Sequence, residues 1–88
     1  MKLEVACFNL DSVAVVAQSK ADRVEFCDNF EAGGTTPSLK DTQKARLLFS
    51  KELLVMIRPR GGDFNYSEEE FNQMKQSILE MKNTGING

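Results

Sequence analysis

The chain contains no histidine, and its 88 residues include only two cysteines. Without histidine and with so few thiols, a four-ligand structural zinc site is excluded. Two cysteines are also too few for the disulfide framework of a small secreted domain. Cys7 and Cys27 are therefore expected either to pack in the interior or to take part in thiol chemistry.

Long apolar runs are absent as well. The longest, residues 13–17 and 53–57, have five residues each, whereas about 20 are needed to span a bilayer. The chain begins Met1-Lys2-Leu3-Glu4, which places an acid where a secretory signal has its apolar stretch. We therefore expect a cytoplasmic protein with no membrane partner.

An excess of basic side chains is also missing. The chain has 11 basic and 13 acidic residues and a net charge of -2, so it lacks the positive surface with which proteins bind a phosphate backbone. We expect no nucleic-acid partner. A composition of 41% hydrophobic and 27% charged residues is typical of a folded globular chain, and the length allows one domain at most.

What the sequence does contain is a repeated alternation of strand and helix patterns. The segments rich in strand formers are residues 3–7, 23–27 and 53–57. The first helix is predicted over residues 13–19 with Asp11 or Ser12 as its cap, and the second runs from Ser38 to about Phe49.

The third helix has the clearest start. Ser67 and Glu70 form a capping box, and Tyr66 and Phe71 are placed to form a hydrophobic staple. Apolar residues at helical spacing follow, and the helix is expected to end at residues 84–85.

Three strand–helix units at a spacing of roughly 25 to 30 residues indicate parallel strands with right-handed crossovers. Such a sheet leaves both edges open, and helices on one side cover only one face, as in a barrel. Residues 85–88 stand where a fourth strand is due. We therefore predict an α/β fold, the first three βα units of a truncated TIM (β/α)8 barrel. Residues 1–88 would be the amino-terminal part of a single barrel domain.

The loops that leave the carboxyl ends of the strands hold the sites of parallel α/β folds. The third of these loops is the most unusual, because Arg58 and Arg60 flank a proline and lead into Gly61, Gly62 and Asp63. Glycine amides allow an anion to approach closely, and arginine binds carboxylates and phosphates. This pattern indicates a site for a small anion.

Two glutamates leave an alternative open. If both loop arginines pair with Glu4 and Glu25 inside the sheet, the glycines only shape a turn. If Glu4, Glu25 and Arg58 all point into a barrel lumen, they form a buried charge cluster and a candidate site with shifted pKa values. Strand alternation places Glu25 and Cys27 on the same side.

The two cysteines end neighbouring predicted strands. Thiolates are preferred ligands of Cu(I), so Cys7 and Cys27 are candidate ligands of this soft ion. Their separation of 20 residues is not a recognised metal-binding spacing, and cysteine often acts as a small buried apolar residue. Metal binding and simple packing both fit the pattern.

Three motifs carry a family resemblance. They are ADRVEFC at residues 21–27, EAGGTTPS at residues 31–38 and VMIRPRGGDF at residues 55–64, followed by Tyr66-Ser67. The chain closely resembles the CutC family of copper homeostasis proteins over essentially its whole length, and the third motif is highly specific. Family members are larger TIM barrels, so the resemblance implies that this chain corresponds to their first three βα units. One departure is Lys20, where relatives usually have the glycine that ends the first helix.

The resemblance implies a cytosolic role in copper handling. It implies Cu(I) as the bound ion, with Cys7 and Cys27 at the positions of its candidate thiolate ligands, and it indicates no organic cofactor. It brings no established reaction, so no catalytic residue is assigned.

Two alternatives to copper binding remain. The first is a barrel enzyme that acts on a small phosphate or carboxylate substrate. Its expected site residues are Arg58 and Arg60 for the anion, the glycine amides at residues 33–34 and 61–62, and Glu4 or Glu25 as the proton carrier. The second is a fragment that associates through its open strand edges, for example as a homo-oligomer.

Overall fold

A parallel three-stranded sheet forms the centre of the structure, a computed structural model that describes residues 3–88. The strands are β1 (Glu4–Cys7), β2 (Arg23–Phe26) and β3 (Glu52–Val55), in the order β1-β2-β3. Their register sets Glu4 beside Arg23 and Arg23 beside Glu52, so all three strands begin at the same level. Their carboxyl ends therefore meet at one edge of the sheet, which we call the carboxyl edge.

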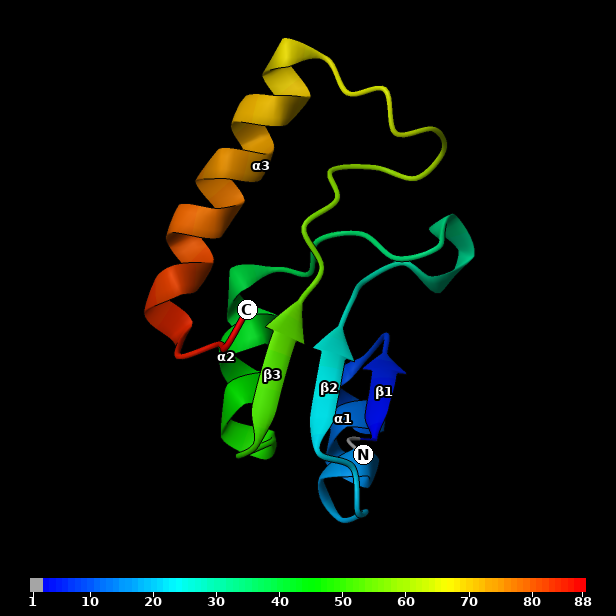
Figure 1. Cartoon of the computed structure of the whole chain (residues 1–88), viewed down its shortest axis with the longest axis vertical. Helices are drawn as coiled ribbons and strands as arrows, with labels where there is room; N and C mark the ends of the chain where they lie inside the picture. Colours follow the sequence, from blue (N-terminus) through cyan, green and yellow to red (C-terminus); the bar gives the residue numbers. More distant parts are fainter. Residues whose placement is uncertain (1–2) are drawn as a thin grey trace.

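Helices cover only one face of this sheet. In Figure 1, α1 (Leu10–Ala17) and α2 (Leu39–Leu48) lie behind the strands, and α3 (Glu68–Met81) lies to one side. Two short 3-10 turns, η1 (Phe30–Ala32) and η2 (Lys82–Thr84), complete the regular structure of residues 3–88. None of the helices found in this range has both the length and the apolar composition needed to cross a bilayer.

The hydrophobic core fills the space between the sheet and its two covering helices. Side chains alternate between the faces of a strand, and Val24, Phe26 and Leu53 point to the covered face, where each is at most 2% exposed. They pack in one cluster with Cys7, Val13, Ala45 and Phe49. The intervening strand positions face the other way, and they include Glu4, Arg23, Glu25 and Glu52.

The helix starts confirm two of the three predicted caps. The hydroxyl of Ser38 accepts the N–H of Asp41, and Ser67 and Glu70 form the complete capping box. The prediction for the first helix is wrong, because Asn9 caps it by accepting the N–H of Ser12 at 2.7 Å. Asn9 has the extended backbone of a cap residue, and the helix therefore begins three residues earlier than expected.

Two further predictions concern the backbone at Lys20 and the aromatic residues at the start of α3. Among residues 3–88, Asn29 is the one non-glycine residue with a positive φ, so Lys20 carries no left-handed strain. Tyr66 packs against Phe64 and Arg60, with a ring-centroid distance of 6.5 Å to Phe64, while Phe71 remains 54% exposed. Gly85 ends the third helical segment in the left-handed conformation, at the predicted position.

The outer edge of β3 has a partner at the end of the chain. The Asn87 N–H donates to the Leu53 carbonyl at 2.8 Å, and the Val55 N–H donates to the Gly88 carbonyl at 2.9 Å. The Asn87 side chain also accepts the Leu53 N–H at 2.9 Å. Residues 87–88 thus run alongside β3, where the sequence predicts a further strand.

Candidate functional site

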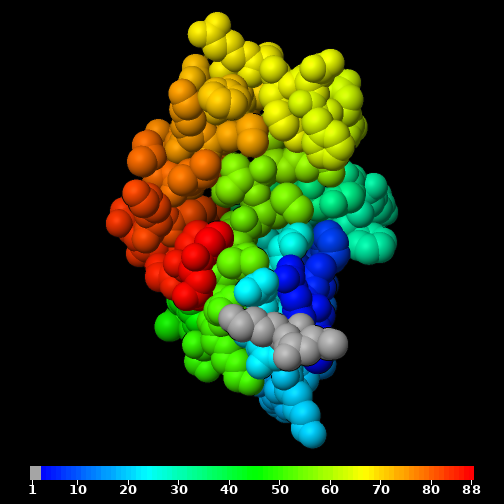
Figure 2. Space-filling view, viewed as in Figure 1, coloured from blue at the N-terminus to red at the C-terminus, as the bar shows by residue number. Residues whose placement is uncertain are grey.

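Two loops that leave the carboxyl edge pack against each other and hold most of the predicted site residues. One follows β2 and the other follows β3. They approach closely at Gly61, where an added Cβ would lie 2.7 Å from the Cβ of Ala32. Figure 2 shows the two loops as adjoining surfaces on the upper right of the molecule.

Arg58 crosses from the second loop to the first. Its Nη1 donates to the carbonyls of Ala32 and Gly34 at 3.0 and 3.3 Å, and its Nη2 donates to the Gly62 carbonyl at 2.9 Å. Thr36 fixes the backbone, since its hydroxyl accepts the Arg58 N–H at 2.8 Å and its own N–H donates to the Arg58 carbonyl at 2.9 Å. The guanidinium is therefore held in one place by both loops.

The charge of Arg58 has no acidic partner, because none of the ion pairs within residues 3–88 includes it. A guanidinium has five N–H donors. Three are used, and the Nε atom is buried without a hydrogen-bond partner. The Arg58 Cζ lies over the Phe64 ring, 4.8 Å from its centre. Because a buried, unpaired donor costs about 1–3 kcal/mol, an acceptor at Nε would stabilise this arrangement.

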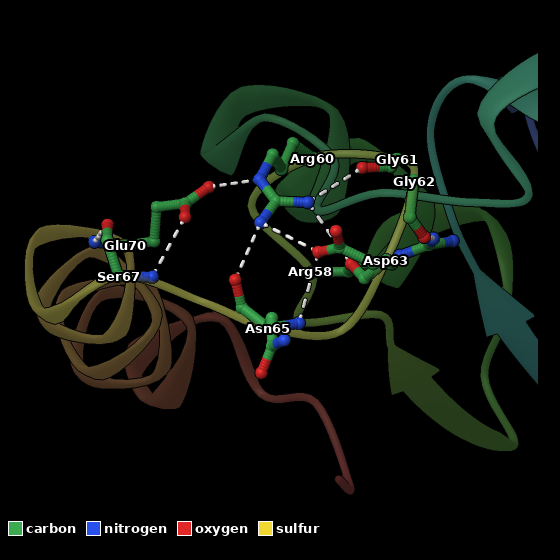
Figure 3. A network of polar contacts seen from close by, with 8 residues as sticks. All are labelled: Arg58, Arg60, Gly61, Gly62, Asp63, Asn65, Ser67 and Glu70. Atoms are coloured by element: carbon green, nitrogen blue, oxygen red, sulfur yellow. Dashed lines mark hydrogen bonds and ion pairs between the residues drawn. The ribbon is translucent and has the colours of Figure 1, made fainter.

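Arg60 has quite different surroundings, as Figure 3 shows. Its Nε donates to Glu70 at 2.5 Å, and its Nη2 lies 3.2 Å from the Asp63 carboxylate. Its remaining bonds go to the carbonyls of Gly61, Asp63 and Asn65. Two carboxylates thus neutralise Arg60, and its donors organise the loop between β3 and α3.

The alternative in which the two loop arginines pair with Glu4 and Glu25 is wrong. Glu4 lies 3.3 Å from Arg23, whose Nε donates to Glu52 at 2.8 Å. These hydrogen bonds, first the one with Glu52, raise the pKa of Arg23. We call Glu4, Arg23 and Glu52 the charge row; it lies at the amino ends of the strands, opposite the carboxyl edge. The signal in the sequence was one charged residue at the start of each strand.

Cys27 lies beside Glu25 under the first loop. It is 2% exposed, and its Sγ donates to Glu25 Oε1 at 3.6 Å. Burial, followed by the negative charge of Glu25, raises the pKa of Cys27 to about 12. An added Cβ at Gly34 would lie 3.5 Å from the Cys27 Cβ. Gly34 therefore adjoins Cys27, which contacts Glu25, and its carbonyl accepts Arg58 Nη1 at 3.3 Å.

Cys7 is a backbone neighbour of Cys27, but its side chain points elsewhere. The Cys27 N–H donates to the Cys7 carbonyl at 2.9 Å. Cys7 is 1% exposed in the core cluster on the helix-covered face, and burial raises its pKa. Cys27 has the strand parity of Glu25, on the opposite face. Residues 3–88 contain no group of three or more cysteine or acidic side chains arranged to hold a metal ion.

Sequence reasoning missed two residues of this site. Thr36 holds the backbone of Arg58, and Phe64 covers its guanidinium. Thr36 stands in a run of loop residues before Pro37, and Phe64 directly follows the glycine pair and Asp63. Neither pattern specifies a partner 22 residues away or a ring over a particular cation.

Comparison with known proteins gives the family. The CutC family profile matches residues 1–88. CutC family proteins of Glaesserella parasuis and Pectobacterium atrosepticum are 43% and 40% identical over 98% and 99% of this chain. The matches cover 35% and 34% of those proteins, so the chain spans about a third of their length.

A crystal structure extends the comparison to the fold. CutC from Streptococcus agalactiae, to which copper homeostasis is assigned provisionally, is 35% identical and superposes with a TM-score of 0.91. The match covers 100% of this chain and 44% of that one. It confirms the predicted fold class, because the three parallel βα units superpose on part of that TIM-barrel-like protein. By profile, sequence identity and structure, this chain belongs to the CutC family.

Proposed function

We propose that the carboxyl-edge site binds a small anion, a carboxylate or a phosphate, as the ligand or substrate of a CutC-family barrel. The observation that supports this proposal is the state of Arg58, which two loops fix in place without any acidic partner among residues 3–88. The N–H groups of Arg58 without a partner are Nε–H, which is buried, and one N–H of Nη2. Charge-assisted contacts of this kind are the strong ones in anion recognition.

The other expected site residues take different parts in this proposal. Glu25 is the candidate proton carrier, because its carboxylate lies beside Cys27, whereas Glu4 is engaged in the charge row. The amides of Gly33 and Gly34 donate to carbonyls of their own loop, so they contribute shape rather than donors. Arg60, Gly61, Gly62 and Asp63 build the loop that holds Arg58 and Phe64. We assign no reaction.

The test is titration of this chain with inorganic phosphate and with acetate, followed by calorimetry or amide chemical shifts. We expect Arg58→Lys to weaken binding about tenfold or more, because lysine lacks the planar fork and charge-assisted bonds contribute about 1.5–3 kcal/mol. Arg46→Lys is the matched control, since Arg46 also donates to backbone carbonyls but lies at the end of α2. Unchanged binding in Arg58→Lys, or no binding by the folded wild type, would refute the anion site.

The second candidate is Cu(I), as the cargo of a copper homeostasis protein. Family membership supports it, and so does the softness of two thiols on adjoining strand ends. The burial of both thiols limits how they could bind the ion. The two thiols leave the sheet on opposite faces and have raised pKa values, so binding by both would require Cys7 to leave the core and both protons to dissociate.

Copper binding by these thiolates would therefore strengthen with pH. Cu(I) titration against a competing chelator under reducing conditions should give a higher affinity at about pH 9 than at about pH 7, and Cys27→Ser should abolish the rise. Glu31→Gln, on the exposed η1 turn, is the control. If the Cu(I) affinity of a folded chain changes neither with pH nor in Cys27→Ser, the thiols are ruled out as ligands.

We also propose a cytoplasmic location. Its support is the state of the thiols, since Cys7 and Cys27 are both free and buried, as is usual in a reducing compartment. Fractionation of the native cells with an antibody against the chain tests this, and recovery outside the cytoplasm would contradict it.

A further inference from the structure

Phenylalanines gather around the carboxyl edge in an unusual way. Of the six in the chain, Phe26 and Phe49 are core residues, whereas Phe8, Phe30 and Phe64 stand one after each strand. We call these three the aromatic rim. Phe30 and Phe64 are 73% and 75% exposed. Phenylalanine is a residue of interiors, and exposed apolar surface beside a polar group is typical of binding sites.

The rim residues border the two loops that hold Arg58. Phe64 lies over Arg58 at 4.8 Å, and Phe8 and Phe30 form an edge-to-face pair with ring centres 5.1 Å apart and an interplanar angle of 88°. Phe8 also borders Gly34, since an added Cβ there would lie 3.4 Å from the Phe8 ring. Gly34 therefore adjoins the Phe8 ring, and its carbonyl accepts Arg58 Nη1 at 3.3 Å.

Arg58 and the aromatic rim could bind different parts of one ligand. A ring stacked on a guanidinium covers its plane and leaves the in-plane N–H groups for an acceptor. An anion at the edge of Arg58 would therefore not compete with Phe64 for the same side of the group. The rest of a ligand that carries this anion would lie against exposed aromatic side chains. Such side chains favour a flat apolar group, in offset-stacked or edge-to-face contact.

We propose that the ligand of this site carries a planar, aromatic ring next to its carboxylate or phosphate. The inference rests on the proposed anion site and names the class of molecule that this site selects. Arg58 provides the charge, and Phe30 and Phe64 provide the apolar contact that simple anions lack.

Two matched probe pairs test the inference on this chain: benzoate against acetate, and phenyl phosphate against inorganic phosphate. The members of each pair share the anion and differ in the ring. We expect the ring-bearing member to bind about tenfold more tightly, a ratio that corresponds to about 1.4 kcal/mol. Phe30→Ala and Phe64→Ala should each reduce this ratio. Phe71→Ala, which removes a comparably exposed ring on α3, should leave it unchanged.

The outcomes separate the inference from the proposed function. Equal affinities within each pair would overturn the ring requirement while the anion site stands. A preference for rings that survives both rim variants would also overturn it, because the contact would then lie elsewhere. Failure of all four probes to bind a chain that circular dichroism shows to be folded would overturn both.

Discussion

Cys27 is a thiol whose surroundings favour the protonated form. Because the charge of Glu25 adds to the effect of burial, Glu25→Gln should lower the pKa of Cys27 from its value of about 12. The measurement is the ultraviolet absorbance of the thiolate during a pH titration, in a Cys7→Ser background so that one thiol titrates. Glu31→Gln is the control, and an unchanged pKa in Glu25→Gln would show that the carboxylate does not act on the thiol.

The same raised pKa links Cys27 to stability. The folded state holds the thiol proton more tightly than the unfolded state does, so this contribution to the free energy of unfolding is fully present below the ordinary value of 9.0. It is lost as the pH rises from there toward about 12.

Gly61 is required for steric reasons. In Gly61→Ala the new Cβ would lie 2.7 Å from the Ala32 Cβ and 3.2 Å from the Ala32 carbonyl oxygen, and the loops would have to separate. We expect a loss of about 1–3 kcal/mol in the free energy of unfolding, typical of overpacking. Urea denaturation measures it. The double variant Ala32→Gly, Gly61→Ala should recover part of the loss, and equal stability of the two variants would show that this contact is not the cause.

Single residues could be predicted where their partners are close in sequence. Ser67 and Glu70 are three positions apart, and the pattern alone identifies their mutual bonds. Asn9, Asp11 and Ser12 are all good cap residues, so the choice among them depends on where β1 ends, which the sequence does not specify.

At the level of elements, the start of α3 is sensitive to acid. The Ser67 backbone N–H, followed by Arg60, lowers the pKa of Glu70 below its ordinary value of 4.5. Because the folded pKa is the lower one, the stabilisation is fully present above the ordinary value and is lost as the pH falls through the folded value. Glu70→Gln should therefore be less stable than the wild type near neutral pH and equally stable in strong acid.

Urea denaturation of both proteins at several pH values between about 7 and 2 provides the comparison. Glu69→Gln, an exposed change in the same helical turn, is the control and should leave the pH dependence intact. A stability difference between Glu70→Gln and wild type that stays constant down to the lowest pH would contradict the role of this carboxylate.

The elements themselves were largely predictable, because each strand and helix has a local apolar period and a cap. Their mutual placement was not. The roles of Arg58 and Arg60 differ because one reaches the preceding loop and the other the following helix. Two arginines separated by one proline offer no local signal for that difference. Arg23 was missed as a partner of Glu4 for the same reason, since their contact depends on strand register.

At the scale of the whole molecule, Arg46 joins the end of α2 both to the turn before β3 and to residues 85–87. From α2 it donates to the carbonyls of Phe49 and Lys51, both at 2.6 Å, and to the Gly85 carbonyl at 2.9 Å. It also donates to the Asn87 side chain at 3.0 Å. These bonds hold the end of the chain against the outer edge of β3.

Arg46→Ala should release that edge. We expect hydrogen exchange to be about tenfold faster or more at the Leu53 and Val55 amides, which bond to Asn87 and Gly88. The variant loses both bonds from Arg46 to Gly85 and Asn87, and even one charge-assisted bond contributes about 1.5 kcal/mol. The Met56 amide, which bonds to Phe26 inside the sheet, is the internal control. Unchanged exchange at Leu53 and Val55 would mean that the terminal segment holds its place without Arg46.

The charge row and the anion site lie at opposite ends of the same strands. A rise of about 3.3 Å per residue places the two ends of a four-residue strand about 10 Å apart, and the guanidinium of Arg23 donates to Glu4 and Glu52 within the row. Mutations that change ligand preference and mutations that change folding should therefore fall into separate sets. A directed-evolution library confined to the loops, with Gly61 and Arg60 kept constant, would select for new ligands while the sheet and its helices stay unchanged.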